Sequence, residues 1–425
     1  MKPNTKKFFL FYVFVSILVF SLHSQVTKTS VFADVRFYYS YTRSLVFDHD
    51  LLLGNEFYQL GVLNQLPQKT FVPNPYPPGA SIFWLPLFYL TTGFLYLLKL
   101  FIPGFNFSGY EVIFEYSVAL TGIFLGIFGL YLIFKSLSKY FSEKVSIMAT
   151  AVLFFATNVF FYIAVEPINS HAASFFISSL FNYYFFIRYP IRHSKLVSES
   201  KEFRSYYFTL GLLGGVAGLI RTQDALLVTL PLICIFLRFR KSLTYLTTSL
   251  IPLATGAFIA FLPQLLLWKY FYNTFWYSPY FETGFNFLRP QIVNVLFNTQ
   301  NGLFTVTPIV AVALIGLINY SYQSFKKMKF RIWNLFSIPN FGFGIYLVGF
   351  IYFILQLYLI SVWNNTQGGS YSIRMIITTY PLLSFGLARI LENAFKKIGD
   401  QKTLTFIVLF TVLNLFSTLN YLLKY

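Results

Sequence analysis

Asp34 has the clearest potential for chemistry in this sequence. The residue follows the first apolar run of the chain, so we expect its carboxylate within a turn or two of a membrane surface. A carboxylate at that depth is costly unless another group pairs with it or a reaction uses it. Its residue type is suited to accepting a proton from an incoming hydroxyl group. A solvated acid at a helix end is the alternative interpretation.

Asp48 stands fourteen residues after Asp34 and is a candidate second acid. On one continuous helix the two residues would be about four turns apart. They can therefore share a pocket only if the segment between them folds back on itself.

Three other side chains have types suited to binding a phosphate. Arg221 and Asp224 interrupt two apolar runs. The planar fork of an arginine matches phosphate oxygens, and the alternative is an ion pair between these two residues. Arg374 begins a later apolar run, where it is expected either to clamp a phosphate or to anchor to a lipid headgroup. His171 follows Glu166 in a tight turn at the start of another run, and a helix N-terminus attracts anions; the alternative is a helix cap.

Two segments contain residues suited to the wall of a pocket. Residues 74–79, Asn-Pro-Tyr-Pro-Pro-Gly, predict a rigid turn because proline fixes φ and removes a hydrogen-bond donor. A loop-to-helix junction alone would also explain them. Residues 363–374 include a paired glycine, which allows a sharp turn or a close approach to a ligand. The candidate wall residues are Tyr38, Tyr76, Glu166, Asp224, Trp363, Gly368, Gly369 and Tyr371.

The composition indicates which elements must position these residues. The chain is 56% hydrophobic and 11% charged, and apolar runs of membrane-spanning length recur along it. Its net charge of +18 comes from short basic clusters between those runs, as in membrane proteins, so a nucleic-acid partner is not expected. The single cysteine, Cys234, excludes an intrachain disulfide, and no zinc-ligand spacing or phosphate-binding glycine loop is found. We expect an all-α polytopic membrane protein without a cofactor; a divalent metal is possible but not indicated.

The distribution of lysine and arginine predicts the topology, because these residues concentrate on the cytoplasmic side. If the apolar run 80–102 lies along the outer surface, 22 of the 32 basic residues fall inside and 10 outside. If that run crosses the membrane, every later basic cluster falls outside. We therefore predict a cytoplasmic N-terminus and about eleven spans. Their approximate bounds are 8–22, 112–134, 145–164, 171–187, 206–220, 224–237, 243–268, 303–320, 341–361, 375–391 and 404–422.

The same topology places 9 of the 14 acidic residues on the outer face, so chemistry by carboxylates is expected there. The main outer loops are 23–111, which would contain juxtamembrane helices, the aromatic-rich 269–302, and 362–374. Residues 1–425 would form a single transmembrane domain, with no separate soluble domain.

These motifs together resemble the GT-C superfamily of integral-membrane glycosyltransferases, particularly bacterial enzymes akin to protein O-mannosyltransferases and the aminoarabinose transferase of lipid A. Members have an acid after the first span within a D-E-x-x-Y pattern, which is similar to residues 34–38, Asp-Val-Arg-Phe-Tyr. The first outer loop of members continues to a Y-P-P-x segment, as in residues 76–79. A W…GG-S-(F/Y)-x-x-R pattern resembles residues 363–374. Val35 stands where many members have a second acid, which leaves metal use and the identity of the acting acid open.

The resemblance implies inverting transfer of a sugar from a polyprenyl-phosphate carrier to a glycan, lipid or protein acceptor. The reaction would take place at the outer face of a bacterial cytoplasmic membrane. Asp34 would be the general base, and Arg221, Arg374 and His171 would bind the departing phosphate. Two alternatives remain: a transporter or flippase of a lipid-linked sugar, and a non-catalytic membrane subunit. The gathering of polar residues at one face favours the enzyme.

Overall fold

The computed structural model describes residues 3–65, 71–193, 201–239, 241–277, 284–327, 341–365 and 370–424. These residues are predominantly helical, and the one β-type pairing among them is an isolated bridge between Phe285 and Trp363. Seven described helical segments are long and apolar enough to cross a membrane. The all-α membrane class predicted from composition is therefore confirmed, while the number of eleven spans stays a prediction.

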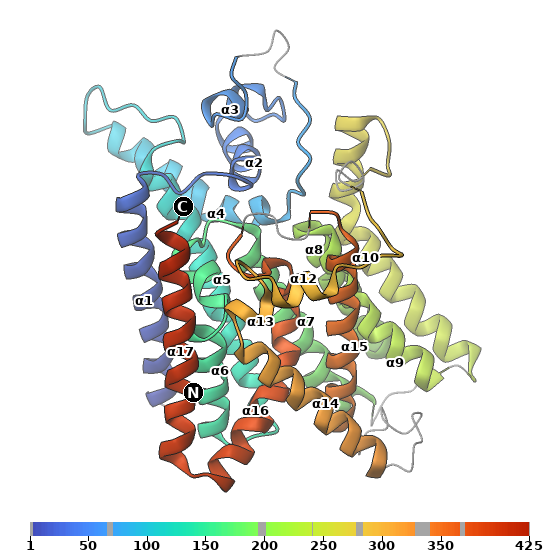
Figure 1. Cartoon of the computed structure of the whole chain (residues 1–425). Coiled ribbons are helices and arrows are strands. Elements are labelled where there is room, and N and C mark those ends of the chain that lie inside the picture. The colour runs from blue at the N-terminus through green and yellow to red at the C-terminus, as the bar shows by residue number, and fades with distance from the viewer. Residues whose placement is uncertain are drawn as a thin grey trace.

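The helices run in the following order. They are α1 (Pro3–Thr27), α2 (Val35–Phe47), α3 (Gly54–Gln59), α4 (Gly79–Lys99), α5 (Val112–Leu137), α6 (Glu143–Phe155), α7 (Ser170–His193), α8 (Lys201–Ile220), α9 (Thr229–Phe239), α10 (Leu243–Tyr272), α12 (Ile292–Phe297), α13 (Leu303–Val306), α14 (Ile309–Lys327), α15 (Phe341–Val362), α16 (Tyr380–Lys397) and α17 (Asp400–Leu422). Figure 1 shows α2 and α3 at the upper end of a bundle of long helices, at the same end as the C-terminus.

Three segments predicted as continuous spans are interrupted near the upper end of the bundle. Phe161–Val165 forms a π-helical turn after α6. Thr222–Val228 and Arg374–Thr379 form 3₁₀ turns that precede α9 and α16. Such irregular turns often occur at functional sites. The candidate residues Glu166, Arg221 and Arg374 all lie at one of these turns.

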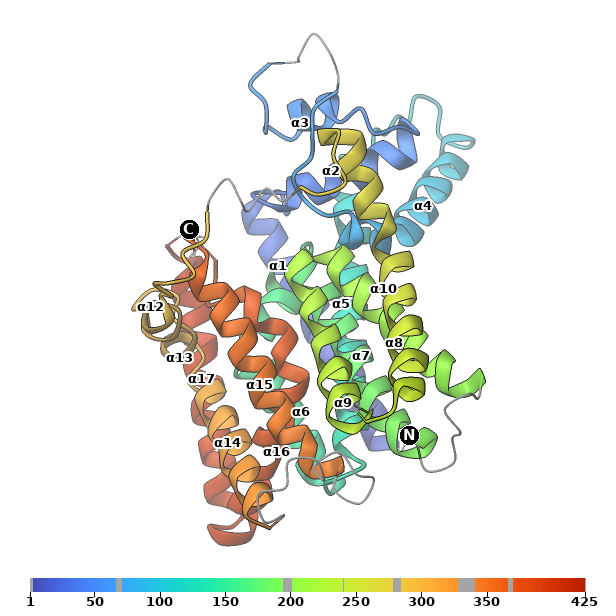
Figure 2. The ribbon, with the colours of Figure 1, turned by 90° about the vertical axis from the view of Figure 1, so that its right-hand side faces the viewer.

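The run predicted to lie along the outer surface forms α4. One side of this helix is buried, including Ala80, Trp84 and Phe88, whereas Leu90 and Leu97 are exposed. Figure 2 shows α4 at the upper end of the molecule, beside α2 and α3. This position agrees with a non-crossing helix. Its length and composition would also allow a crossing, so the topology remains a prediction.

Glycines allow α8 and α10 to pack closely. A Cβ atom added at Gly211 would lie 2.0 Å from the carbonyl oxygen of Leu253, and one at Gly256 would lie 2.2 Å from that of Phe208. Small residues at such contacts are how membrane helices associate without a hydrophobic driving force.

We expect Gly211→Ala to destabilise the protein, because the added methyl group meets backbone rather than a flexible side chain. Overpacking of this kind costs about 1–3 kcal/mol, which a melting curve in detergent would show as a lower midpoint. Gly93→Ala is the matched control, since nothing lies within 4 Å of its added Cβ. Equal melting of the two variants would contradict the close contact of α8 with α10.

Cysteine accessibility tests the topology in a Cys234→Ser background. Asn106 follows α4 and Lys139 follows α5, so the two residues lie on opposite sides of the membrane in either topology. If α4 does not cross, an impermeant maleimide labels Asn106→Cys in intact cells and Lys139→Cys only after permeabilisation. The reverse pattern would show that α4 crosses.

Candidate active site at the Asp34–Arg374 ion pair

Asp34 and Arg374 form an ion pair although they lie 340 residues apart in the sequence. The Nη2 atom of Arg374 donates to Oδ2 of Asp34 at 2.6 Å, and the hydroxyl of Tyr76 donates to Oδ1 at 2.8 Å. The Asp34 side chain is 32% exposed and that of Arg374 is 27% exposed. The pair is therefore held on both carboxylate oxygens and still open to a ligand.

The turn at residues 74–79 positions the Tyr76 hydroxyl. The Asn74 side chain donates to the carbonyl of Phe37 at 2.8 Å and accepts the backbone N–H of Tyr76 at 3.0 Å. The Tyr76 ring stacks on Phe37, with centroids 4.7 Å apart, and meets Tyr38 edge-on at 5.3 Å. Because Phe37 and Tyr38 belong to α2, this turn is fixed to the helix that begins after Asp34. Tyr38 is buried and supports the site without reaching its surface.

The segment before Arg374 is fixed from two sides. The hydroxyl of Tyr162 donates to the carbonyl of Tyr371 at 2.9 Å. The Tyr371 ring stacks on Phe161 with centroids 4.7 Å apart, and its hydroxyl donates to Oδ1 of Asn414 at 2.9 Å. Ser372 has a φ of +52°, a conformation that non-glycine residues adopt at a cost. These contacts aim the Arg374 side chain at Asp34.

Arg221 and His171 form a second, deeper pair. The Nη1 atom of Arg221 lies 3.2 Å from Nδ1 of His171. Because a guanidinium group only donates, Nδ1 must accept, and the imidazole is neutral with its proton on Nε2. The His171 ring also packs against Tyr162 at 4.6 Å. Both partners are buried, at 6% and 3% exposure, so this pair lies behind the accessible Arg374.

The structure shows no salt bridge between Arg221 and Asp224 within its described residues. Asp224 is completely buried and accepts a hydrogen bond from the Ser174 hydroxyl at 2.6 Å. Among the described residues, its other carboxylate oxygen has no hydrogen-bond partner. Asp224 is therefore close to Arg221 in sequence but does not line the accessible part of the site.

The second acid near Asp34 is Glu166. The pKa of its carboxyl group is raised to about 7, because burial and the charge of Asp34 raise it more than Arg374 lowers it. Asp48 instead lies at the far end of α2, about 20 Å away for a helix of 13 residues. There it contacts Arg43 and Asn55. Since α2 is continuous, the folding back that a shared pocket required does not occur.

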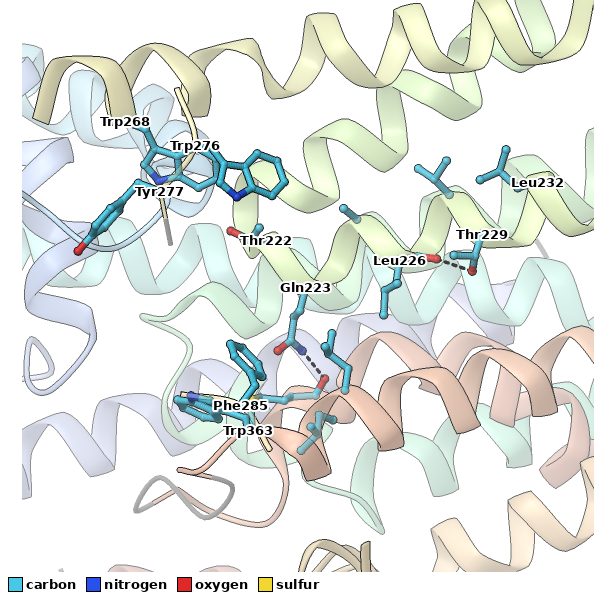
Figure 3. Close-up of a pocket in the computed structure, with 15 residues that line it drawn as sticks. Thr222, Gln223, Leu226, Thr229, Leu232, Trp268, Trp276, Tyr277, Phe285 and Trp363 are labelled. Carbon is cyan, nitrogen blue, oxygen red and sulfur yellow. Dashed lines mark hydrogen bonds between the residues drawn. The ribbon is translucent and has the colours of Figure 1, made fainter. Parts of the chain in front are cut away.

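An apolar groove of about 470 Å³ is lined in part by Met375, the residue that follows Arg374 in the sequence. Figure 3 shows Trp268, Trp276 and Tyr277 on one side of it and Phe285 and Trp363 on the other. The Gln223 side chain lies between the two sides and donates to the carbonyl of Met375 at 3.0 Å. Thr222 and Met375, the sequence neighbours of Arg221 and Arg374, also line the groove. An apolar ligand in this groove would thus end near both arginines.

The outcome for the predicted site residues is mixed. The described contacts connect several predicted residues, and Glu166 interacts electrostatically with two of them, Asp34 and Arg374. The connected residues are Asp34, Tyr76, His171, Arg221, Tyr371 and Arg374, while Trp363 lines the apolar groove. Gly368 and Gly369 lie outside the described residues. Tyr162 and Gln223 were not predicted. Tyr162 stands within an apolar run that marks it only as membrane-embedded, although Gln223 lies within the polar stretch around Arg221 and could have been singled out.

The described residues contain no group of three or more His, Cys, Asp and Glu side chains that could hold a metal. The arrangement supplies a carboxylate open to solvent, a cation bonded to it, and a neutral imidazole behind. These groups are suited to accepting a proton and to binding an anion at neighbouring positions.

The chain matches no protein-family model and no curated protein sequence. Among solved structures it is similar to the Archaeoglobus fulgidus oligosaccharyltransferase in the apo form, with a TM-score of 0.48 and 12% sequence identity. The alignment covers 99% of this chain and 56% of the archaeal protein, so the chain spans about half the length of that protein. We therefore base a function on the residues of this chain alone.

The raised pKa of Glu166 gives a pH dependence of stability with a defined sign. The folded state holds a proton that the unfolded state releases at lower pH, since the pKa is about 7 when folded and 4.5 ordinarily. Stability is therefore lost as pH rises through this range. We expect Glu166→Gln to melt like the wild type near pH 4.5 and at a higher temperature above pH 7.

Glu111 offers a control of opposite sign. Burial would raise its pKa, but hydrogen bonds, including those from the Ser108 and Gly109 N–H groups, lower it below the ordinary value. Glu111→Gln should therefore be less stable than the wild type at neutral pH, and this difference should disappear in acid. Parallel pH profiles for the wild type and Glu166→Gln would show that Glu166 titrates normally.

Proposed function

We propose that this protein is a membrane glycosyltransferase that moves a sugar from a polyprenyl-phosphate donor to an acceptor at the outer face of a bacterial cytoplasmic membrane. The observation that carries this proposal is the Asp34–Arg374 pair, together with an apolar groove that the next residue, Met375, helps to line. A base and an anion-binding group thus lie together where a lipid chain can be accommodated.

The groove is suited to the lipid part of the donor. Its lining is almost entirely apolar, and its volume of about 470 Å³ lies within the ~300–1,000 Å³ usual for small-molecule pockets. An isoprenoid chain bound there would place its phosphate near Thr222 and Met375. Arg374 is adjacent to Met375 and accessible, so it is the residue that would bind this phosphate.

Asp34 would then act on the acceptor. It takes the proton of an acceptor hydroxyl as that oxygen forms a bond to the anomeric carbon of the donor sugar. The bond from this carbon to the phosphate oxygen breaks, and polyprenyl phosphate leaves with the bonding electron pair. Attack opposite the leaving group inverts the anomeric centre. Because the leaving group is already a phosphate, Arg374 stabilises it directly, and this route requires no metal.

The ion pair gives a reason why the base acts only when the donor is present. In the pair, Oδ2 of Asp34 already accepts the hydrogen bond of Arg374, so this oxygen is not free to receive an acceptor hydroxyl. A donor phosphate competes for the same guanidinium group and releases Oδ2 of Asp34, while Tyr76 continues to hold Oδ1. Arg221 and His171 lie deeper and support the region around Arg374.

Asp34→Asn should abolish transfer, because an amide cannot accept the hydroxyl proton; a general base contributes about 10²–10⁴-fold. Release of polyprenyl phosphate from lipid-linked sugars, with an envelope extract as acceptor, measures this. Asp48→Asn is the matched control at the other end of α2 and should keep its activity if it melts normally. Full activity of Asp34→Asn would remove Asp34 from the mechanism.

The wild-type protein and the Asp34→Asn variant also distinguish a transferase from a flippase. Vesicles containing the protein and a fluorescent lipid-linked sugar, without acceptor, should show no added movement of the label between leaflets. Movement that persists in Asp34→Asn would support the transporter and overturn the enzyme.

A further inference from the structure

We propose that a polar cavity between α13 and α17 binds the acceptor as a sugar ring that carries an acidic group. This inference rests on the proposed function, since it assigns the second substrate of that reaction. The cavity has a volume of about 240 Å³ and lies among the α12–α13 turn, residues 370–371 and the last turns of α17. Figure 2 shows α12 and α13 near the C-terminus.

The lining of this cavity is the opposite of that of the apolar groove. Hydroxyl and amide groups dominate it, and each of these groups can both donate and accept hydrogen bonds. Such groups match the ring of hydroxyls on a sugar, whereas they would be costly against a lipid chain. The principal polar side chains are Thr299, Gln300, Asn301, Thr305, Ser417 and Asn420.

Two of these side chains are accessible and available to bind a ligand. Among the described residues, Ser417 and Asn420 make no side-chain hydrogen bond, although both face the cavity from the last turns of α17. Polar groups in native proteins are normally satisfied by protein, water or ligand. The Tyr421 ring beside them is half-buried and meets Tyr371 edge-on at 5.5 Å. An aromatic ring can pack against the apolar C–H face of a sugar.

The positive charge in the lining of this cavity favours a sugar with an acidic group. Lys424 is the charged side chain that lines the cavity in the described part of the chain, and no carboxylate lines it there. An ammonium group attracts a carboxylate or phosphate substituent. The volume is slightly below the ~300–1,000 Å³ usual for ligand pockets, which fits one ring better than several.

The cavity also lies close enough to Asp34 for a glycan bound in it to extend to this carboxylate. Tyr371 lines the cavity, Arg374 is bonded to Asp34, and Met375 lines the apolar groove. Three residues from Tyr371 to Arg374 span at most about 10–11 Å of extended chain. The acceptor cavity and the donor groove would thus each be lined by a residue within three positions of Arg374 in the sequence. A glycan that extends one or two rings beyond the cavity would reach Asp34.

Saturation-transfer NMR on the purified protein in detergent tests this site without the unknown donor. The probes are glucuronate and glucose, which differ at one carbon. We expect glucuronate to give a transfer signal with the wild type, and glucose a signal at least several-fold weaker. Asn420→Leu should abolish the glucuronate signal, and Lys424→Gln should remove the preference over glucose. Asn319→Leu on α14 is the matched control and should retain it.

The outcomes separate this inference from the proposed function. Asp34→Asn should bind glucuronate normally, because Asp34 is not among the residues that line the cavity. No signal with either sugar, or a glucuronate signal unchanged in a normally melting Asn420→Leu, would overturn the site. Loss of binding in Asp34→Asn would place the acceptor at the ion pair instead. A wild-type protein that binds glucuronate but transfers nothing would overturn the enzyme while leaving the sugar site in place.

Discussion

The ion pair between Asp34 and Arg374 joins an early and a late part of the sequence. It forms because the surrounding helices bring these two residues together. The pair is partly exposed, and ion pairs open to solvent stabilise a protein by only about 0–1 kcal/mol, so this pair does not hold the bundle together. Instead, the geometry of the ion pair depends on the fold. Tyr76, fixed to α2 through Asn74 and Phe37, orients the carboxylate, and the contacts of Tyr371 orient the guanidinium group. The fold keeps two opposite charges in contact at a surface that a ligand can reach.

Interruptions of helices, rather than helices, bring the remaining groups to this point. The π-helical turn before Glu166 and the 3₁₀ turns at Arg221 and Arg374 all occur near the same end of the bundle. A regular helix would satisfy its backbone groups internally and would carry these side chains past the site. Each turn instead lies next to the end or the start of a helix. Acidic, cationic and imidazole groups from distant parts of the sequence are thereby concentrated in a small volume.

The class of protein and several site residues could be predicted from the sequence, because charged residues beside apolar runs are unusual. Asp34, Arg221 and Arg374 are conspicuous for this reason, and the prolines around Tyr76 mark a fixed turn. Which of these residues form pairs could not be predicted, because the pairs depend on how the helices pack. The sequence makes Asp48 a plausible second acid, but α2 is one continuous helix, so Asp48 lies at the opposite end of α2 from Asp34. Tyr162 looks like any other aromatic residue in a membrane segment, and only its contact with Tyr371 shows its role.

Asn414 of α17 has a consequence for the assembly of the protein in the cell. Its amide nitrogen donates to the carbonyls of Phe155 and Thr157, and its oxygen accepts from Tyr371. One side chain thus joins the last described helix to the end of α6 and to the segment that carries Arg374. During synthesis, every helix before α17 enters the membrane while these bonds are still missing. The segment that carries Arg374 therefore gains these fixing contacts only after α17 has been made and has packed against α6.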